Sequence, residues 1–272
     1  MYSVIFVPMK KSIFYVFAVC AILLAIICSA GCVTNDQNYD GQSLLVYSGA
    51  GLKGPMAEIG TTFGEKYNVT VDLTYGGSGV LISQMATTKL GDIFIPGGEP
   101  DYENAVAKGL VNETYQPVAY HVPVIAVTKG NPYGIETVED LATPGLRVAL
   151  GDVNATAIGK AGVIIFTKAG VLDSVEKNVV LRGATINEVV TALSTGNADA
   201  AVLTLDSANQ DLFTTIEIPV TDNSILVTPI GVTTFTTQPE LAQLFADFVA
   251  SDEGKAILEK YGFPAYPNDK YT

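Results

Sequence analysis

Two short glycine-rich stretches of this chain combine small residues with a serine. Residues 48–51 read Ser-Gly-Ala-Gly and residues 77–79 read Gly-Ser-Gly, and each stretch lies between an apolar run and a helical pattern. Glycine lets the backbone approach a ligand closely, and the free N–H groups of a helix start carry the positive end of the helix dipole. An oxyanion can bind there without a cationic side chain. A plain strand-to-helix turn would have the same pattern.

Side chains that could support catalysis are scarce. His121 is the only histidine, and it does not lie beside a Gly-x-Ser-x-Gly motif. The cysteines all fall within residues 1–32, and the chain has neither a zinc-like His/Cys spacing nor a P-loop motif. Glu99 and Asp101 could bind a cation or act as an acid and base, but solvated acids at a helix start are the favoured interpretation. We therefore expect no enzyme, no metal site and no cofactor.

The charge of the chain argues against nucleic acid as a partner. The 272 residues carry a net charge of −13, and Arg147 and Arg182 are the only arginines. Residues 1–31 contribute two lysines and no acid, so the remainder has 13 basic and 28 acidic residues, a net charge of −15. Without a basic stripe, this composition predicts a well-solvated surface and no nucleic-acid binding. We expect a monomer.

The N-terminus has the pattern of an export signal. Two lysines precede an apolar stretch over 13–28, which ends in Ser-Ala-Gly-Cys at residues 29–32, a sequence similar to a lipobox. We predict a signal peptide over 1–31, lipid attachment at Cys32 and a linker over 32–42. The domain would then lie at the outer face of the cell membrane, held by its lipid, or in the periplasm. An uncleaved helix anchor is the alternative.

The elements that must position the two glycine-rich stretches alternate between strand and helix, which favours parallel sheets with crossover helices. The expected strands are 44–47, 69–74, 91–95, 118–128, 146–150, 178–182, 198–204 and 225–232. The expected helices are 55–67, 80–90, 101–110, 157–168, 186–193 and two more, over 241–249 and after Ser251. The first three strands all end in glycine-rich loops, and ligands bind at this edge of open α/β sheets.

Pro123 inside the strand-like segment 118–128 disfavours a central strand and suits a chain that crosses between two lobes. We expect lobe 1 to comprise 43–118 with 225–272, and lobe 2 to comprise 119–224. Two such lobes enclose a cleft that can close on a small ligand by hinge motion.

Several segments together resemble the substrate-binding proteins of ABC importers, most closely the molybdate/tungstate-binding group. The similar segments are 48–52, 77–79, 91–94, 118–121, 150–153, 196–200 and 251–263. The resemblance covers residues 44–264. It implies a periplasmic binding protein type II fold, an α/β architecture of two lobes joined by crossing hinge strands.

The resemblance also implies a ligand site. Ser78 matches the second oxyanion-binding serine of the group, whereas Gly51 stands where its first ligand serine is expected. Thr156 lies near a family valine that binds through its backbone N–H, and Thr204 replaces a tyrosine. Each donor lost to a buried anion costs about 1.5–3 kcal/mol if nothing replaces it. The ligand-binding residues expected are Ser48, Gly49, Ala50, Gly51, Gly77, Ser78, Ala119, Tyr120, Ala155, Thr156 and Thr204.

The function implied is capture of molybdate or tungstate, bound as an oxyanion with no direct contact to its metal, and delivery to an ABC permease and its ATPase. Sulfate, phosphate and ferric iron are alternative ligands. Phosphate retains a proton and would need a buried carboxylate acceptor such as Asp206 or Glu99, whereas iron would need clustered tyrosines such as Tyr75, Tyr102 and Tyr120. A tethered ligand sensor and a carboxylate-dependent hydrolase are the alternatives from other classes.

Overall fold

The computed structural model describes residues 39–271, which form one compact unit. The expected signal peptide and Cys32 lie outside the described residues. Within residues 39–271, no helix has the length and apolar character needed to cross a membrane.

The first sheet consists of β1 (Ser43–Gly49), β2 (Thr70–Gly76), β3 (Ile93–Ile95), β4 (Gln116–His121) and β10 (Leu226–Val232). Its strand order is β2-β1-β3-β10-β4. β1 pairs parallel with β2 and β3, and β10 is antiparallel to β3 and β4. The carboxyl ends of β1, β2 and β3 therefore meet at one edge, as expected from the sequence.

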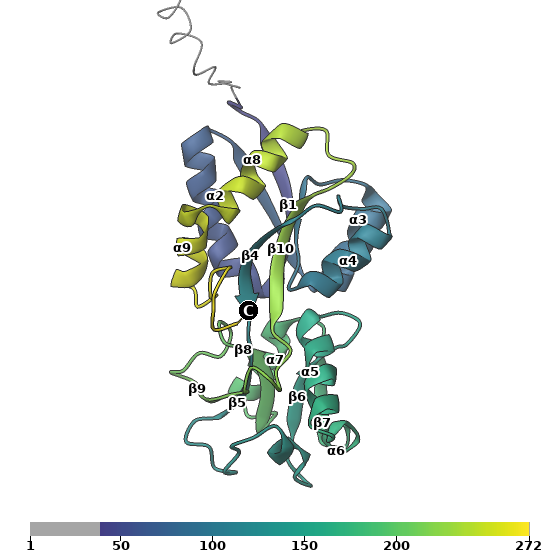
Figure 1. The fold of residues 1–272 in the computed structure, drawn as a ribbon, viewed down its shortest axis with the longest axis vertical. Helices are drawn as coiled ribbons and strands as arrows, with labels where there is room; N and C mark the ends of the chain where they lie inside the picture. The colour runs from purple at the N-terminus through teal and green to yellow at the C-terminus, as the bar shows by residue number, and fades with distance from the viewer. Residues whose placement is uncertain (1–38, 272) are drawn as a thin grey trace, which may run out of the picture. The chain divides into compact units, whose positions relative to one another are not determined.

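Helices cover both faces of this sheet (Figure 1). They are α2 (Lys53–Tyr67), α3 (Ser78–Thr88), α4 (Glu99–Ala107), α8 (Pro239–Ala250) and α9 (Asp252–Lys260). On one face, Phe63 of α2 packs edge-on against Phe245 and Phe248 of α8, with ring centroids 5.0 and 5.5 Å away. On the other face, buried side chains of α3 and α4, including Met85 and Tyr102, pack against the sheet. We call this sheet with its helices lobe 1.

The second sheet consists of β5 (Pro123–Thr128), β6 (Val148–Gly151), β7 (Val179–Gly183), β8 (Ala200–Thr204) and β9 (Phe213–Glu217). Its order is β7-β6-β8-β5-β9, with β6 parallel to β7 and β8 and with β5 antiparallel to β8 and β9. Its helices are α5 (Ala157–Lys168), α6 (Leu172–Glu176) and α7 (Ile186–Ser194), with a 3-10 turn η2 (Glu139–Ala142). Residues of α5 and α7 share one buried core with the sheet. We call this assembly lobe 2.

The chain passes between the sheets at two places. β4 stays paired with β10 as far as His121, which is in register with Leu226. β5 begins at Pro123, so the single residue Val122 separates the two sheets. The segment 118–128, which Pro123 indicated as a crossing between the lobes, therefore consists of two strands in different sheets. The chain returns through residues 218–225 into β10, which lies beside β4 (Figure 1).

Candidate functional site

A small cavity of about 40 Å³ lies between the strand ends of lobe 1 and the helix starts of lobe 2. We call it the interlobe pocket. Its lining combines small residues, threonines and one histidine, with no lysine, arginine, aspartate or glutamate. The residues that line it are Gly49, Ala50, Gly51, Gly76, Gly77, Ser78, Gly97, His121, Thr156, Ala157, Ile158, Thr185, Ile186 and Thr204.

The first glycine-rich stretch connects β1 to α2 through a 3-10 turn, η1 (Ala50–Leu52). β1 ends at Gly49, and Gly49, Ala50 and Gly51 all line the pocket. The N–H groups at the start of a helical segment have no partner within it, so this turn offers backbone donors at the pocket wall. Ser48, also expected here, is fully buried and donates to the carbonyl oxygen of Gly49 at 3.3 Å, and it does not line the pocket.

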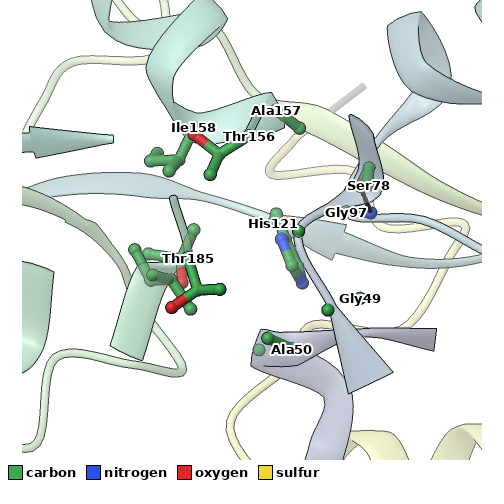
Figure 2. Close-up of a pocket in the computed structure, with 14 residues that line it drawn as sticks. Gly49, Ala50, Ser78, Gly97, His121, Thr156, Ala157, Ile158 and Thr185 are labelled. Atoms are coloured by element: carbon green, nitrogen blue, oxygen red, sulfur yellow. Dashed lines mark hydrogen bonds between the residues drawn. The ribbon is translucent and has the colours of Figure 1, made fainter. Parts of the chain in front are cut away.

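The second stretch brings Ser78 into the pocket. Gly77 occupies the N-cap position of α3, and Ser78 is its first helical residue, so the hydroxyl of Ser78 is not a helix cap. Its Oγ accepts a hydrogen bond from the backbone N–H of Gly97 at 3.3 Å, which Figure 2 shows as a dashed line. Because the oxygen already has this donor, its own proton remains available for a ligand acceptor. Gly97, from the third glycine-rich loop, was not among the residues expected in the site.

Lobe 2 contributes the starts of two helices. Thr156 caps α5: its Oγ1 accepts from Gly159 N–H at 3.0 Å and donates to Asp152 O at 2.9 Å. The backbone N–H of Thr156 also donates to Asp152 O, at 2.9 Å. Thr156 lines the pocket, but its donors are used within lobe 2. The next residues, Ala157 and Ile158, carry the N–H groups that the first turn of α5 leaves unpaired.

The second of these helices was predicted over 186–193, but the sequence did not indicate that its start lines the pocket. Thr185 caps α7 by accepting from Glu188 N–H at 3.4 Å, while the Glu188 carboxylate accepts from Ala184 N–H at 3.0 Å. The Thr-x-x-Glu spacing is that of a capping box, but here the glutamate accepts from the residue before the cap and not from the N–H of Thr185 itself. Figure 2 shows Thr156 and Thr185 on one side of the pocket and Gly49, Ala50 and Ser78 on the other.

Three other expected residues lie outside the lining. Ala119 and Tyr120 are buried in β4, where Tyr120 N–H donates to Pro264 O at 2.8 Å, so that backbone donor is already used. Ala155 N–H donates to the Asp152 carboxylate at 3.0 Å. Its carbonyl oxygen accepts from Gly79 N–H, at 3.3 Å, across the gap between the lobes. Ala155 therefore forms a hydrogen bond between the two lobes at a position beside the pocket.

Thr204 lies at the end of β8, is 2% exposed and lines the pocket. Its Oγ1 is 2.9 Å from Ser207 Oγ, and Ser207 Oγ is 2.9 Å from Asp206 Oδ2. Asp206 itself does not line the pocket.

His121 lines the pocket although it was not among the ligand-binding residues expected from the sequence. It is the last residue of β4, where the chain leaves the first sheet, and its ring lies 5.0 Å from that of Phe263. Its Nε2 is buried and has no hydrogen-bond partner among the described residues. Burial lowers the pKa of His121, and the nearby Asp206 carboxylate opposes this effect. Figure 2 shows its ring between the two sets of lining residues.

The lobes touch around the pocket. A Cβ atom at Gly77 would lie 2.4 Å from Ala184 O and 3.0 Å from Ala155 O, both of lobe 2, so this approach requires glycine. Lys160 of α5, in lobe 2, forms an ion pair with Asp101 of α4, in lobe 1, and the side chain of Asp101 is 2% exposed. Among residues 39–271, no group of three or more His, Cys, Asp or Glu side chains is placed to hold a metal ion.

Comparisons with known proteins agree with this architecture. The family model of bacterial extracellular solute-binding proteins matches residues 44–264. A binding protein of Haemophilus influenzae is 32% identical over 222 residues, 81% of this chain and 90% of the relative. The molybdate-binding protein ModA of Mycobacterium tuberculosis is 27% identical over 82% of this chain and 84% of its own length.

Among solved structures, the sulfate-binding protein SubI of Mycobacterium tuberculosis superposes with a TM-score of 0.75. It is 19% identical, and the match covers 83% of this chain and 88% of that one. At this low identity, the structural similarity supports the fold and does not identify the ligand. The predicted two-lobe type II fold is confirmed.

Proposed function

Since the chain belongs to the family of bacterial extracellular solute-binding proteins, we propose that it captures a tetrahedral oxyanion, molybdate or tungstate, in the interlobe pocket. The resemblance stated from the sequence is thereby confirmed at the level of the family. In our proposal the loaded protein delivers the anion to an ABC permease, which an ATPase drives. It works as a monomer outside the cytoplasmic membrane, held there by a lipid on Cys32, and performs no chemistry.

The observation that carries the proposal is the convergence of helix starts on one small cavity. The first turns of α3, α5 and α7 and the turn η1 all contribute lining residues. Each start adds unpaired N–H groups and the positive end of a helix dipole, and together they favour a compact anion.

The size and lining of the pocket favour an ion over a larger solute. Pockets for drug-sized ligands have volumes of roughly 300–1,000 Å³, whereas this cavity measures about 40 Å³. The lining carries no lysine or arginine, so recognition would depend on the number of hydrogen-bond donors and on cavity size. The ModA relative, which is named as a molybdate-binding protein, supports molybdate within this class.

A thermal-unfolding experiment tests the proposal. The full chain, purified in mild detergent, is heated with molybdate, tungstate, sulfate, phosphate or ferric citrate at several concentrations. A ligand that binds only the folded state stabilises it by about 2.7 kcal/mol at a hundredfold excess over its Kd. We expect Tm to rise by several degrees with molybdate and tungstate. A rise with sulfate, phosphate or ferric citrate alone would replace the proposed ligand, and no rise with any of them would refute oxyanion capture.

A further inference from the structure

Behind the pocket, three side chains form a relay that ends in a buried carboxyl oxygen. Thr204 faces the pocket, Ser207 lies between, and Asp206 is at the far end, with both oxygen–oxygen distances 2.9 Å. The second carboxyl oxygen, Asp206 Oδ1, is buried without a hydrogen-bond partner among the described residues.

The hydrogen bonds of this relay can run in either direction, because each hydroxyl has one proton to donate and lone pairs that accept. When Asp206 is ionised, it can only accept. Ser207 then donates to Asp206 and Thr204 donates to Ser207, so Thr204 presents only lone pairs to the pocket. When Asp206 is protonated, it can donate to Ser207, and Ser207 can donate to Thr204. The proton of Thr204 is then free to point into the pocket.

We propose that Asp206 determines the specificity of the interlobe pocket by setting whether Thr204 donates to the ligand or accepts from it. With the proton on Asp206, the pocket suits a fully deprotonated oxyanion, whose oxygens only accept. With Asp206 ionised, it suits an anion that still carries a proton, such as hydrogen phosphate. This inference rests on the proposed function, because it assumes an oxyanion in the pocket.

The surroundings of Asp206 favour the protonated form. Burial of the carboxyl group raises its pKa, and the attraction of His121, hydrogen bonds from the hydroxyls of Ser207 and Thr204, and a backbone hydrogen bond oppose this only in part. The titratable groups near it are His121 and Tyr261. His121 comes from β4, and burial lowers its pKa, so a charged pair is disfavoured on both sides. Tyr261, which follows α9 and lines the same hollow as Asp206, has its hydroxyl engaged with Glu58 at 2.9 Å.

Protonation of Asp206 makes the Kd of the oxyanion depend on pH. If a deprotonated oxyanion needs protonated Asp206, binding takes up one proton wherever free Asp206 is ionised. The Kd for that anion therefore rises with pH above the pKa of Asp206, by at most about tenfold for each pH unit. The Kd is constant below that pKa.

The test measures the Kd of molybdate and of sulfate by calorimetry between pH 5.5 and 8.5, using the full chain in detergent without a histidine tag. The variants are Asp206→Asn, whose amide always has protons for Ser207, and Ser207→Ala, which interrupts the relay. Asp211→Asn, at an exposed position of the same lobe, is the matched control.

We expect the parent and the control to bind more weakly as the pH rises. Asp206→Asn should bind with a constant Kd, and Ser207→Ala should bind more weakly and with a smaller dependence on pH, since Thr204 also contacts Asp206 directly.

The outcomes separate the relay from the function. Binding to the parent with a flat pH profile, or an unchanged slope in Asp206→Asn, overturns the relay and leaves oxyanion capture standing. Absence of binding to the parent refutes the proposed function. Because His121 is the only histidine, its ring nitrogen NMR signals also report on Asp206 without a ligand. At a pH where Asp206 is ionised, its charge raises the pKa of His121, so the pKa of His121 should then be lower in Asp206→Asn than in the control.

Discussion

Replacement of Ser78 by alanine is the most direct test of the pocket. Ser78 is 4% exposed, and its hydroxyl accepts from Gly97 N–H at 3.3 Å and retains a proton for the ligand. Its removal takes away one donor to the anion and leaves the N–H of Gly97 without its partner. The surrounding helix should persist, because the N-cap position of α3 belongs to Gly77.

The expected loss of affinity follows from the charge of the ligand. A hydrogen bond to a charged group contributes about 1.5–3 kcal/mol, and 1.4 kcal/mol corresponds to a factor of ten. Ser78→Ala should therefore raise the Kd for molybdate by about 10- to 150-fold. The value should fall at the upper end if Gly97 N–H finds no water in the closed pocket.

Titration calorimetry with molybdate provides the measurement, and thermal unfolding without ligand separates affinity from stability. Ser83→Ala is the matched control, since Ser83 lies on the same helix, is exposed and donates to Gly79 O at 2.9 Å. Its Kd should equal that of the parent. A Kd of Ser78→Ala within twofold of the parent would mean that the anion binds elsewhere or uses backbone donors alone.

Two further predictions concern closure and acid stability. Gly77→Ala should weaken molybdate binding at least tenfold and leave the lobes further apart in small-angle scattering, since its Cβ would meet Ala184 O at 2.4 Å. Gly162→Ala, whose Cβ would meet only a side-chain atom at an ordinary 3.6 Å, should bind as the parent does; equal affinities for the two variants would contradict the argument. Asp199 accepts hydrogen bonds from the Arg147 guanidinium, which lowers the pKa of Asp199. The stabilisation that this ion pair gives is therefore complete above the unfolded-state pKa of about 3.9, and it is lost as the pH falls through the lower folded-state pKa. Asp199→Asn should therefore lower Tm at pH 7 and make Tm less dependent on pH below 4, and a parallel Tm profile for parent and variant would refute this.

Local sequence patterns predicted the elements better than their contacts. α5 has the bounds expected from the sequence, Ala157–Lys168, because its start and its apolar face are both local features. β9 and α6 were not predicted: each has five residues, and β9 obtains its hydrogen bonds from the distant strand β5. Short segments of this kind are defined by their neighbours.

The candidate site was predictable where the glycine-rich stretches follow the strands of lobe 1, and less so for the other lining residues. Gly49 ends β1, Gly51 follows it, and Ser78 follows the end of β2, which is the parallel neighbour of β1, so their convergence follows from topology. Whether His121 lines the pocket depends on where β4 ends and the chain leaves the first sheet. Whether Thr185 lines it depends on how lobe 2 packs against lobe 1. Neither relation appears in the local sequence, although the Thr-x-x-Glu pattern that marks the start of α7 does.

The order of strands in the first sheet has a consequence for how the protein is made. β4 has β10 as its sheet neighbour, and β10 is separated from it in the chain by all of lobe 2. A growing or translocating chain can complete the second sheet from residues 123–217 while β4 still lacks its neighbour. His121, at the end of β4, is fixed only after β10 arrives. The pocket is therefore assembled late, and a chain truncated before residue 226 would keep most of its binding residues without a site to hold them.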